Sequence, residues 1–84
     1  MSRTSEPYKA SFSEGEKVRI ASLGMLIQFQ RDWQAHHAVT EAQFPYANQE
    51  AVVRRVSFYH MGTVLYELED IPGFWHEPCL VASG

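Results

Sequence analysis

The fold is decided by residues 51–69, which read AVVRRVSFYHMGTVLYELE. Both halves of this stretch are rich in β-branched and aromatic residues, which favour strands. A glycine at position 62 separates the halves, as is typical of a short hairpin loop. In residues 64–69 the apolar Val64, Tyr66 and Leu68 stand at every second position, so the sequence predicts a β-hairpin here. The inward side chains of its second strand would be Val64, Tyr66 and Leu68.

Two adjacent arginines, Arg54 and Arg55, interrupt the alternation of the first hairpin strand. Successive side chains of a regular strand point to opposite faces, so one arginine would enter the core. We therefore expect a β-bulge at this pair, because an extra residue in one strand lets both charges stay in water. The inward side chains of this strand are predicted to be Val52, Val56 and Phe58.

The residues before the hairpin predict one strand and one helix. Residues 17–21 alternate between polar and apolar side chains, which indicates a half-buried strand with Val18 and Ile20 inward. Residues 25–44 contain neither glycine nor an internal proline, and their apolar side chains recur at the spacing of a helix face. Ser22 is the candidate N-cap of that helix.

Turns and short strands are expected in the rest of the chain. Residues 44–49 have the composition of a connecting loop, and residues 70–73 read Asp-Ile-Pro-Gly, which predicts a turn. Residues 74–77 predict a short strand that Pro78 ends, and residues 79–82 predict a last one. The predicted core consists of Val18, Ile20, Val52, Val56, Phe58, Val64, Tyr66, Leu68 and Leu80.

Eighty-four residues are enough for one domain only. Residues 1–13 are mostly polar, so we expect a flexible N-terminal arm followed by a single domain at residues 14–84. Several short strands, one tight hairpin and a long connection after the first strand predict a mainly β fold. The expected architecture is a small five-stranded, SH3-like, partly open barrel with a helical insertion after the first strand.

Two segments of the chain resemble a known group of small barrels. They read GEKVRI at residues 15–20 and WHEPCL at residues 75–80, with Pro45-Tyr46 and a valine-rich strand between them. This pattern, over residues 12–82, is similar to the SH3-like electron-transport accessory domains. That group includes the nitrile hydratase β subunit, a photosystem I accessory subunit and the variable chain of ferredoxin-thioredoxin reductase. The resemblance implies a barrel that carries no chemistry and docks against a larger redox or metal-containing subunit.

The composition argues against several kinds of partner. Seven basic and ten acidic residues give a net charge of -3, whereas binding nucleic-acid phosphates requires surplus positive charge. The hydrophobic content of 45% is low for a membrane protein, and no apolar run stands at the N-terminus, so we expect neither a membrane nor secretion. A single cysteine, Cys79, favours a reducing, cytoplasmic location. A protein partner is expected instead, and the chain could also form a homo-oligomer.

Histidines and the cysteine are the residues that could hold a metal. His60, His76 and Cys79 have the side chains of a zinc or copper site, and a small transition-metal-handling protein using these three is the alternative to a binding module. Their spacing does not complete a four-ligand set, so we expect no metal or other cofactor. The adjacent His36 and His37 would point about 100° apart on a helix and would therefore share no ion.

Catalysis is not the expected activity. Cys79 with a histidine base could act as a nucleophile, but the sequence indicates no oxyanion hole. A chain of this length also lacks an obvious second layer to enclose a substrate. A non-metal subunit of a nitrile hydratase-like enzyme is a further alternative, in which the metal would lie in another chain.

Acidic and aromatic residues gather in the last third of the chain. No lysine or arginine follows Arg55, and one of the adjacent Phe74 and Trp75 must face outward if their strand alternates. Tryptophan is among the residues most often found as a binding hot spot. An exposed aromatic ring beside carboxylates suits a basic, arginine-bearing or proline-rich partner segment. The predicted partner-binding residues are Tyr59, Glu69, Asp70, Phe74, Trp75, His76 and Glu77.

Overall fold

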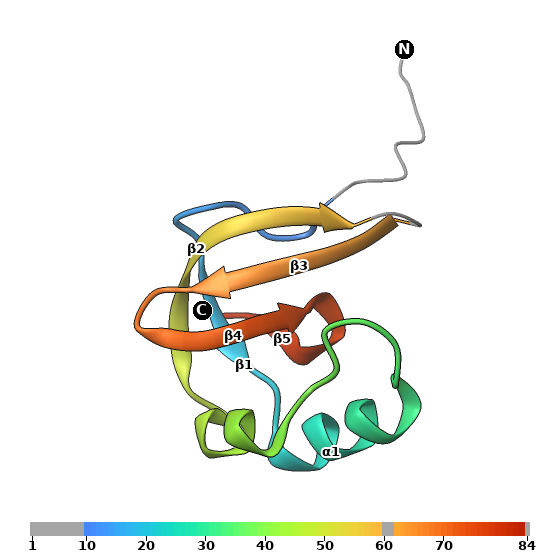
Figure 1. Cartoon of the computed structure of the whole chain (residues 1–84). Coiled ribbons are helices and arrows are strands. Elements are labelled where there is room, and N and C mark those ends of the chain that lie inside the picture. Colours follow the sequence, from blue (N-terminus) through green and yellow to red (C-terminus); the bar gives the residue numbers. More distant parts are fainter. Residues whose placement is uncertain (1–9, 60–61, 84) are drawn as a thin grey trace.

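The structure, a computed structural model, describes residues 10–59 and 62–83. Its five strands form one antiparallel sheet in the order β4-β3-β2-β1-β5, with a helix after the first strand (Figure 1). The mainly β, five-stranded fold with a helical insertion is therefore confirmed. In chain order the elements are β1 Lys17–Ile20, α1 Leu23–Asp32, η1 Glu41–Tyr46, β2 Glu50–Tyr59, β3 Thr63–Leu68, β4 Ile71–His76, η3 Glu77–Cys79 and β5 Leu80–Ala82.

The sheet is an open barrel. The last strand, β5, returns to pair with β1, placing Leu80 opposite Ile20. β4 and β5 are the two edges, and no strand pairing joins them in the described part of the chain, so the barrel does not close. Figure 1 shows α1 and η1 side by side beneath the strands. Within residues 10–59 and 62–83, no helix has the length and apolar character needed to cross a membrane.

The helix after β1 is shorter than predicted. Ser22 is its N-cap, as expected, and its Oγ accepts a hydrogen bond from the Met25 N–H at 3.3 Å. The helix ends at Asp32, well before the predicted end. The reason is that Trp33 adopts an extended conformation, and its indole Nε1–H donates to the His36 carbonyl oxygen at 2.8 Å. This contact closes a turn that competes with further helix.

The second part of the insertion is the 3-10 helix η1, so the loop predicted at residues 44–49 is helical up to Tyr46. Gln43 anchors this helix and is almost fully buried. Its Oε1 accepts from the Thr40 N–H at 2.9 Å, and its Nε2 donates to the Phe74 carbonyl oxygen at 2.9 Å. The second bond ties η1 to β4, the edge strand of the sheet.

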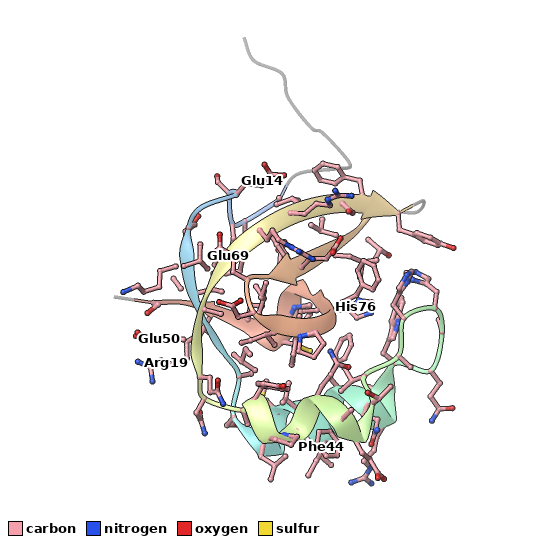
Figure 2. The ribbon with its side chains drawn as sticks, turned by 60° about the vertical axis from the view of Figure 1, so that its left-hand side comes forward. Glu14, Arg19, Phe44, Glu50, Glu69 and His76 are labelled. Atoms are coloured by element: carbon pink, nitrogen blue, oxygen red, sulfur yellow. The ribbon has the colours of Figure 1, made fainter. Side chains whose placement is uncertain are left out.

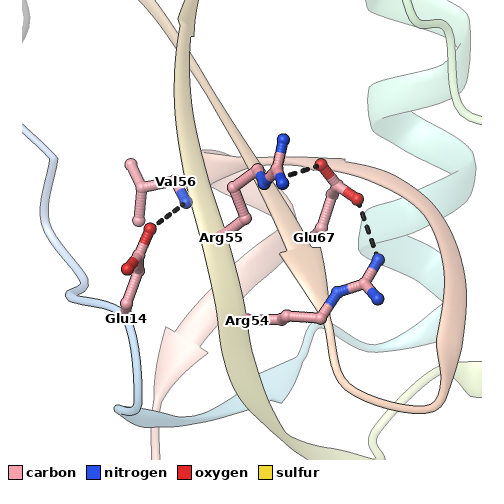
Figure 3. Close-up of polar contacts among 5 residues, drawn as sticks. All are labelled: Glu14, Arg54, Arg55, Val56 and Glu67. Carbon is pink, nitrogen blue, oxygen red and sulfur yellow. Dashed lines mark hydrogen bonds and ion pairs between the residues drawn. The ribbon is translucent and has the colours of Figure 1, made fainter.

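The arginine pair forms the expected β-bulge. The register of β2 against β3 shifts between Val53 and Arg55. Both arginines stay in water, and both reach the same carboxylate: the distances are 2.9 Å from Arg54 Nη2 and 3.9 Å from Arg55 Nε to oxygens of Glu67 (Figure 3). Exposed pairs of this kind contribute little to stability. The main effect of the bulge is therefore to keep two charges outside the core.

The bulge also changes which side chains of β2 face inward. Val53 is 1% exposed, whereas Val52 and Val56 are half-buried and Phe58 is 50% exposed. The predicted inward set was therefore wrong at Phe58 and missed Val53. The extra residue reverses the alternation, so Val53 instead of Val52 faces inward before the bulge. Phe58 pairs with the buried Val64 and therefore keeps the predicted phase, but it lies near the end of β2 and is exposed there.

The turn between β3 and β4 is tighter than predicted. Leu68 pairs with Ile71, so only Glu69 and Asp70 form the turn, with Asp70 in the left-handed region at φ 63°. Aspartate is one of the few side chains that adopts this conformation readily. Pro72 and Gly73, which were expected in the turn, lie inside β4. A proline fits there because β4 is an edge strand.

The core combines the barrel interior with segments that do not alternate. Val18, Ile20, Val64, Tyr66, Leu68 and Leu80 are buried, as predicted. Phe12 is buried too, and its ring meets Tyr66 edge-on at 5.6 Å. Residues 10–13 therefore pack on the domain, while residues 1–9 of the expected arm lie outside the described residues. The remaining buried apolar residues are Ala21, Leu26, Val39, Val53, Leu65, Trp75 and Cys79.

Truncating a buried leucine should destabilise the chain far more than truncating an exposed one. Leu68 is 1% exposed and Leu23 is 44% exposed. We expect Leu68→Ala to lower the free energy of unfolding by about 2 to 5 kcal/mol, and Leu23→Ala by under about 1 kcal/mol. Denaturant unfolding followed by fluorescence measures both. Equal losses in the two variants would contradict the assignment of the core.

Two glycines allow the contact with Gln43 to be measured. Gly15 and Gly73 both have positive φ, at 89° and 96°, but a Cβ at Gly15 meets nothing while a Cβ at Gly73 lies 3.1 Å from Gln43 Nε2. Gly15→Ala should lower the free energy of unfolding by about 1 to 2 kcal/mol through backbone strain, and Gly73→Ala by more. In a Gln43→Ala background, Gly73→Ala should destabilise the chain no more than Gly15→Ala does. An excess that persists would mean that the clash is not with this side chain.

Candidate functional site

The predicted partner-binding residues fall into two separate groups. Glu69 and Asp70 lie at the turn between β3 and β4, where they line a depression of about 300 Å³ together with Tyr46 and Glu50. His76 lies at the far end of β4, and Figure 2 shows it well away from Glu69. The structure therefore does not bring all seven predicted residues onto one face.

The two adjacent aromatic residues of β4 point in opposite directions. Phe74 is 40% exposed, whereas Trp75 is fully buried in the barrel. The alternation of the strand decides this, since Trp75 pairs with the buried Tyr66. The prediction that one of the pair faces outward is correct, but Trp75 has no exposed surface for a partner. Its indole Nε1–H is buried without a hydrogen-bond partner among the described residues.

His76 is a buried histidine that holds the insertion against the barrel. Only 3% of it is exposed, because the rings of Phe29 and Trp33 cover it, with centroids 5.0 and 5.1 Å away. Its Nε2 lies 2.9 Å from the His37 carbonyl oxygen. A carbonyl oxygen only accepts, so Nε2 carries the proton. The contact joins β4 to the loop that follows α1.

The same surroundings keep the His76 imidazole neutral. Burial lowers its pKa below 6.5, and the nearby His36 and His37 lower it further, although the hydrogen bond to the His37 carbonyl acts in the opposite direction. An uncharged ring with Nε2 protonated leaves Nδ1 as an acceptor. His76 therefore acts as a structural donor, and burial of a positive charge there is unfavourable.

Four rings from three segments meet beside His76, and we call them the aromatic surface: His36, His37, Tyr59 and Phe74. The His36 ring lies 4.1 Å from that of Tyr59, and the His37 ring lies 5.4 Å from Tyr59 and 4.9 Å from Phe74. The two histidines approach each other with Nδ1 atoms 2.9 Å apart. Tyr59 and Phe74 keep 37% and 40% of their area exposed.

The helix predicted over residues 25–44 placed these histidines incorrectly. On the predicted helix His36 and His37 would diverge. In the structure they follow the end of α1, and His37 adopts φ 55°, which lets both rings turn toward the barrel. A non-glycine residue in this region is uncommon and often marks a functional segment. Nothing in the local sequence pattern indicates that conformation.

A cavity of about 340 Å³ lies next to the aromatic surface, between the end of α1 and η3. Glu77 lines it, and this carboxylate accepts three hydrogen bonds: from the Tyr66 hydroxyl at 2.7 Å, the Ser11 hydroxyl at 2.7 Å and the Ser11 N–H at 3.2 Å. Burial acts to raise the Glu77 pKa, but these bonds together hold it below 4.5. The full lining consists of Phe29, Trp33, Gly62, Thr63, Val64, His76, Glu77 and Pro78.

The Tyr66 hydroxyl completes this network and is set up as a donor. Burial first, and then its bond to Glu77, raise the pKa of Tyr66 to about 12. The hydroxyl also accepts from the N–H groups of Ser11 and Phe12. These hydrogen bonds therefore hold Ser11 and Phe12 beside the cavity.

Two of the residues considered for metal binding or catalysis, His76 and Cys79, are buried. Cys79 is 1% exposed, and burial raises the pKa of its thiol to about 11, so the nucleophilic thiolate is disfavoured. The Nε2 of His76 is engaged by a carbonyl, and His60 lies outside the described residues. Among the residues that the structure describes, no three histidine, cysteine or acidic side chains are arranged to hold a metal ion.

Comparisons of the chain with protein-family models, with curated proteins and with solved structures found no match. The functional assignment therefore depends on the geometry of the aromatic surface and of the neighbouring cavity.

Acidification should destabilise the chain through His76. Its pKa is about 6.5 when unfolded and lower when folded, so below pH 6.5 the unfolded chain takes up a proton that the folded chain refuses. The free energy of unfolding should therefore fall as the pH drops from 6.5 toward the folded-state pKa. In His76→Gln, whose amide can still donate to the His37 carbonyl, the slope between pH 7 and pH 5 should be smaller. Denaturant unfolding at several pH values measures it, and identical slopes would contradict this role.

Proposed function

We propose that this chain is a non-catalytic protein-binding module that acts as an accessory or adaptor unit. The observation that carries the proposal is the aromatic surface, in which Tyr59 and Phe74 remain exposed although they pack on two histidines. Aromatic side chains are enriched at protein interfaces because they bury a large area at a small entropic cost. A basic or proline-rich segment is the partner chemistry that such rings suit.

The rigidity of the aromatic surface supports the proposal. The loop after α1 is fixed by the bond from Trp33 Nε1–H to the His36 carbonyl and by the bond from His76 to the His37 carbonyl. Gln43 fixes the carbonyl of Phe74 in the same way. A surface that is already ordered loses little conformational entropy on binding, so more of its contact energy appears as affinity.

The side chains of Cys79 and His76 are engaged in packing, which favours binding over catalysis. Cys79 is buried as a thiol, and His76 is held neutral beneath Phe29 and Trp33. A general base or nucleophile must instead be able to reach a substrate. One buried, unpaired cysteine also fits a reducing, cytoplasmic location.

Docking on a larger redox or metalloenzyme subunit is the narrower form of the proposal. Its support is the resemblance of residues 15–20 and 75–80 to SH3-like electron-transport accessory domains. In the fold these segments are the turn into β1 and the passage from β4 through η3 into β5. Both belong to the barrel frame, so they support an accessory barrel without naming its partner.

Removing an aromatic ring should weaken partner binding strongly. We expect Phe74→Ala and Tyr59→Ala each to reduce affinity roughly thirtyfold, which corresponds to a loss of about 2 kcal/mol. The control is Met25→Ala, which removes a side chain that is 55% exposed in the first turn of α1. The measurement is affinity capture from native lysate followed by titration with the identified partner.

The arginine pair serves as the opposing test. Arg54→Ala/Arg55→Ala removes two exposed charges from β2 without touching the aromatic surface. If that double variant abolishes capture while Phe74→Ala and Tyr59→Ala retain it, with every variant folded, the binding face has been chosen wrongly. Circular dichroism of each variant checks the folding.

A further inference from the structure

We infer that the cavity beside Glu77 receives the side chain of an arginine from the partner segment that lies on the aromatic surface. This inference rests on the proposed function and names the chemistry of its ligand. It follows from three observations: a carboxylate with no cationic partner among residues 10–59 and 62–83, a wall of aromatic rings, and a direct connection to the aromatic surface.

Glu77 is an acidic group that the described residues do not neutralise. The ion pairs of the described chain join Arg19 to Glu50, and Arg54 and Arg55 to Glu67, so none involves Glu77. Its three hydrogen-bond donors, two from Ser11 and one from Tyr66, are uncharged.

Two of these bonds reach Glu77 Oε1 and one reaches Oε2. A carboxylate has about four acceptor positions, so Oε2 can accept one more donor. The described residues that line the cavity include no lysine or arginine. A positively charged ligand in the cavity would therefore meet an ionised carboxylate that can accept one more hydrogen bond.

The aromatic wall favours a cation as well. The rings of Phe29 and Trp33 are nearly parallel, with an angle of 14° between them, and both pack against His76. Ring faces carry negative charge density, and a guanidinium stacks on them while its N–H groups bind a carboxylate. His76 is kept neutral by burial, so it does not repel a cation. An anionic ligand would meet only repulsion from Glu77.

The cavity and the aromatic surface are adjacent. Trp33 lines the cavity, and its ring contacts that of His36 at 5.3 Å, while the rings of His36 and His76 are 5.9 Å apart. A peptide on the aromatic surface could therefore insert one long side chain here. A volume of about 340 Å³ lies at the lower end of ligand pockets and fits a single side chain better than a large ligand.

The test uses the full chain and two small probes. N-acetyl-arginine amide carries the cation, and N-acetyl-citrulline amide has nearly the same shape without the charge. We expect the arginine probe to shift the Trp33 indole Nε1–H resonance saturably, with a dissociation constant on the order of 1 mM. The citrulline probe should bind at least about tenfold more weakly, because it loses the charge-assisted bond.

Matched variants locate the probe. Glu77→Gln keeps the shape of the side chain and one of its two oxygens, replaces the other oxygen with an NH2 group and removes the charge, and it should weaken binding of the arginine probe roughly tenfold. Glu69→Gln makes the same change in net charge at the distant turn and should leave binding unchanged. Equal weakening in both variants, equal binding of the two probes, or no saturable shift would each overturn the inference. Binding only after Lys9→Gln would also overturn it, because a residue of the same chain would then be the occupant.

The inference and the proposed function fail in different ways. If Phe74→Ala abolishes partner capture but the arginine probe does not bind, the proposed binding module is supported and the arginine site is contradicted. If the probe binds at Glu77 but Phe74→Ala and Tyr59→Ala leave capture unaffected, the cavity is a cation site. The aromatic surface is then not the docking face, and the inferred partner segment is contradicted as well.

Discussion

The hydrogen bond from His76 to the His37 carbonyl is the contact on which the candidate site depends. The segment between α1 and η1 pairs with no strand, so side chains must hold it against the barrel. His76 does this from β4, and its bond fixes a loop in which His37 adopts a left-handed conformation. Because of that conformation the rings of His36 and His37 reach Tyr59 and Phe74. The aromatic surface therefore follows from one buried imidazole.

The outer edge of β4 is covered by the same insertion. An edge strand presents unpaired backbone groups that invite association with another strand. Gln43 satisfies one of them, the Phe74 carbonyl, and Gly73 provides the room for the Gln43 side chain to approach. The insertion thus protects this part of the sheet edge and also holds the backbone of Phe74, whose ring stays exposed. Because this part of the edge is covered, the binding proposed here would use side-chain contacts rather than strand addition to β4.

Local alternation was enough to predict the barrel but not the site. Val18 and Ile20, the second hairpin strand and the bulge at Arg54 and Arg55 could be predicted, because each depends on neighbouring residues only. The end of α1 could not, since it depends on a bond between the Trp33 indole and the His36 carbonyl. Of the predicted binding residues, Tyr59, Phe74, His76 and Glu77 gather at one end of the barrel. Glu69 and Asp70 separate from them because a two-residue turn places them at the other end of the hairpin.

The distribution of charge distinguishes Glu77 from the acidic residues that form ion pairs. Glu67 is neutralised by two arginines and Glu50 by Arg19, whereas the hydrogen-bond donors to Glu77 among the described residues are all uncharged. Left-handed strain at His37 costs about 1 kcal/mol or more, and burying His76 adds a penalty at low pH. Strain of this kind persists only where the surrounding packing determines it. In this chain Phe29 and Trp33 supply that packing, so the rings that shield His76 also line the cavity beside the Glu77 carboxylate.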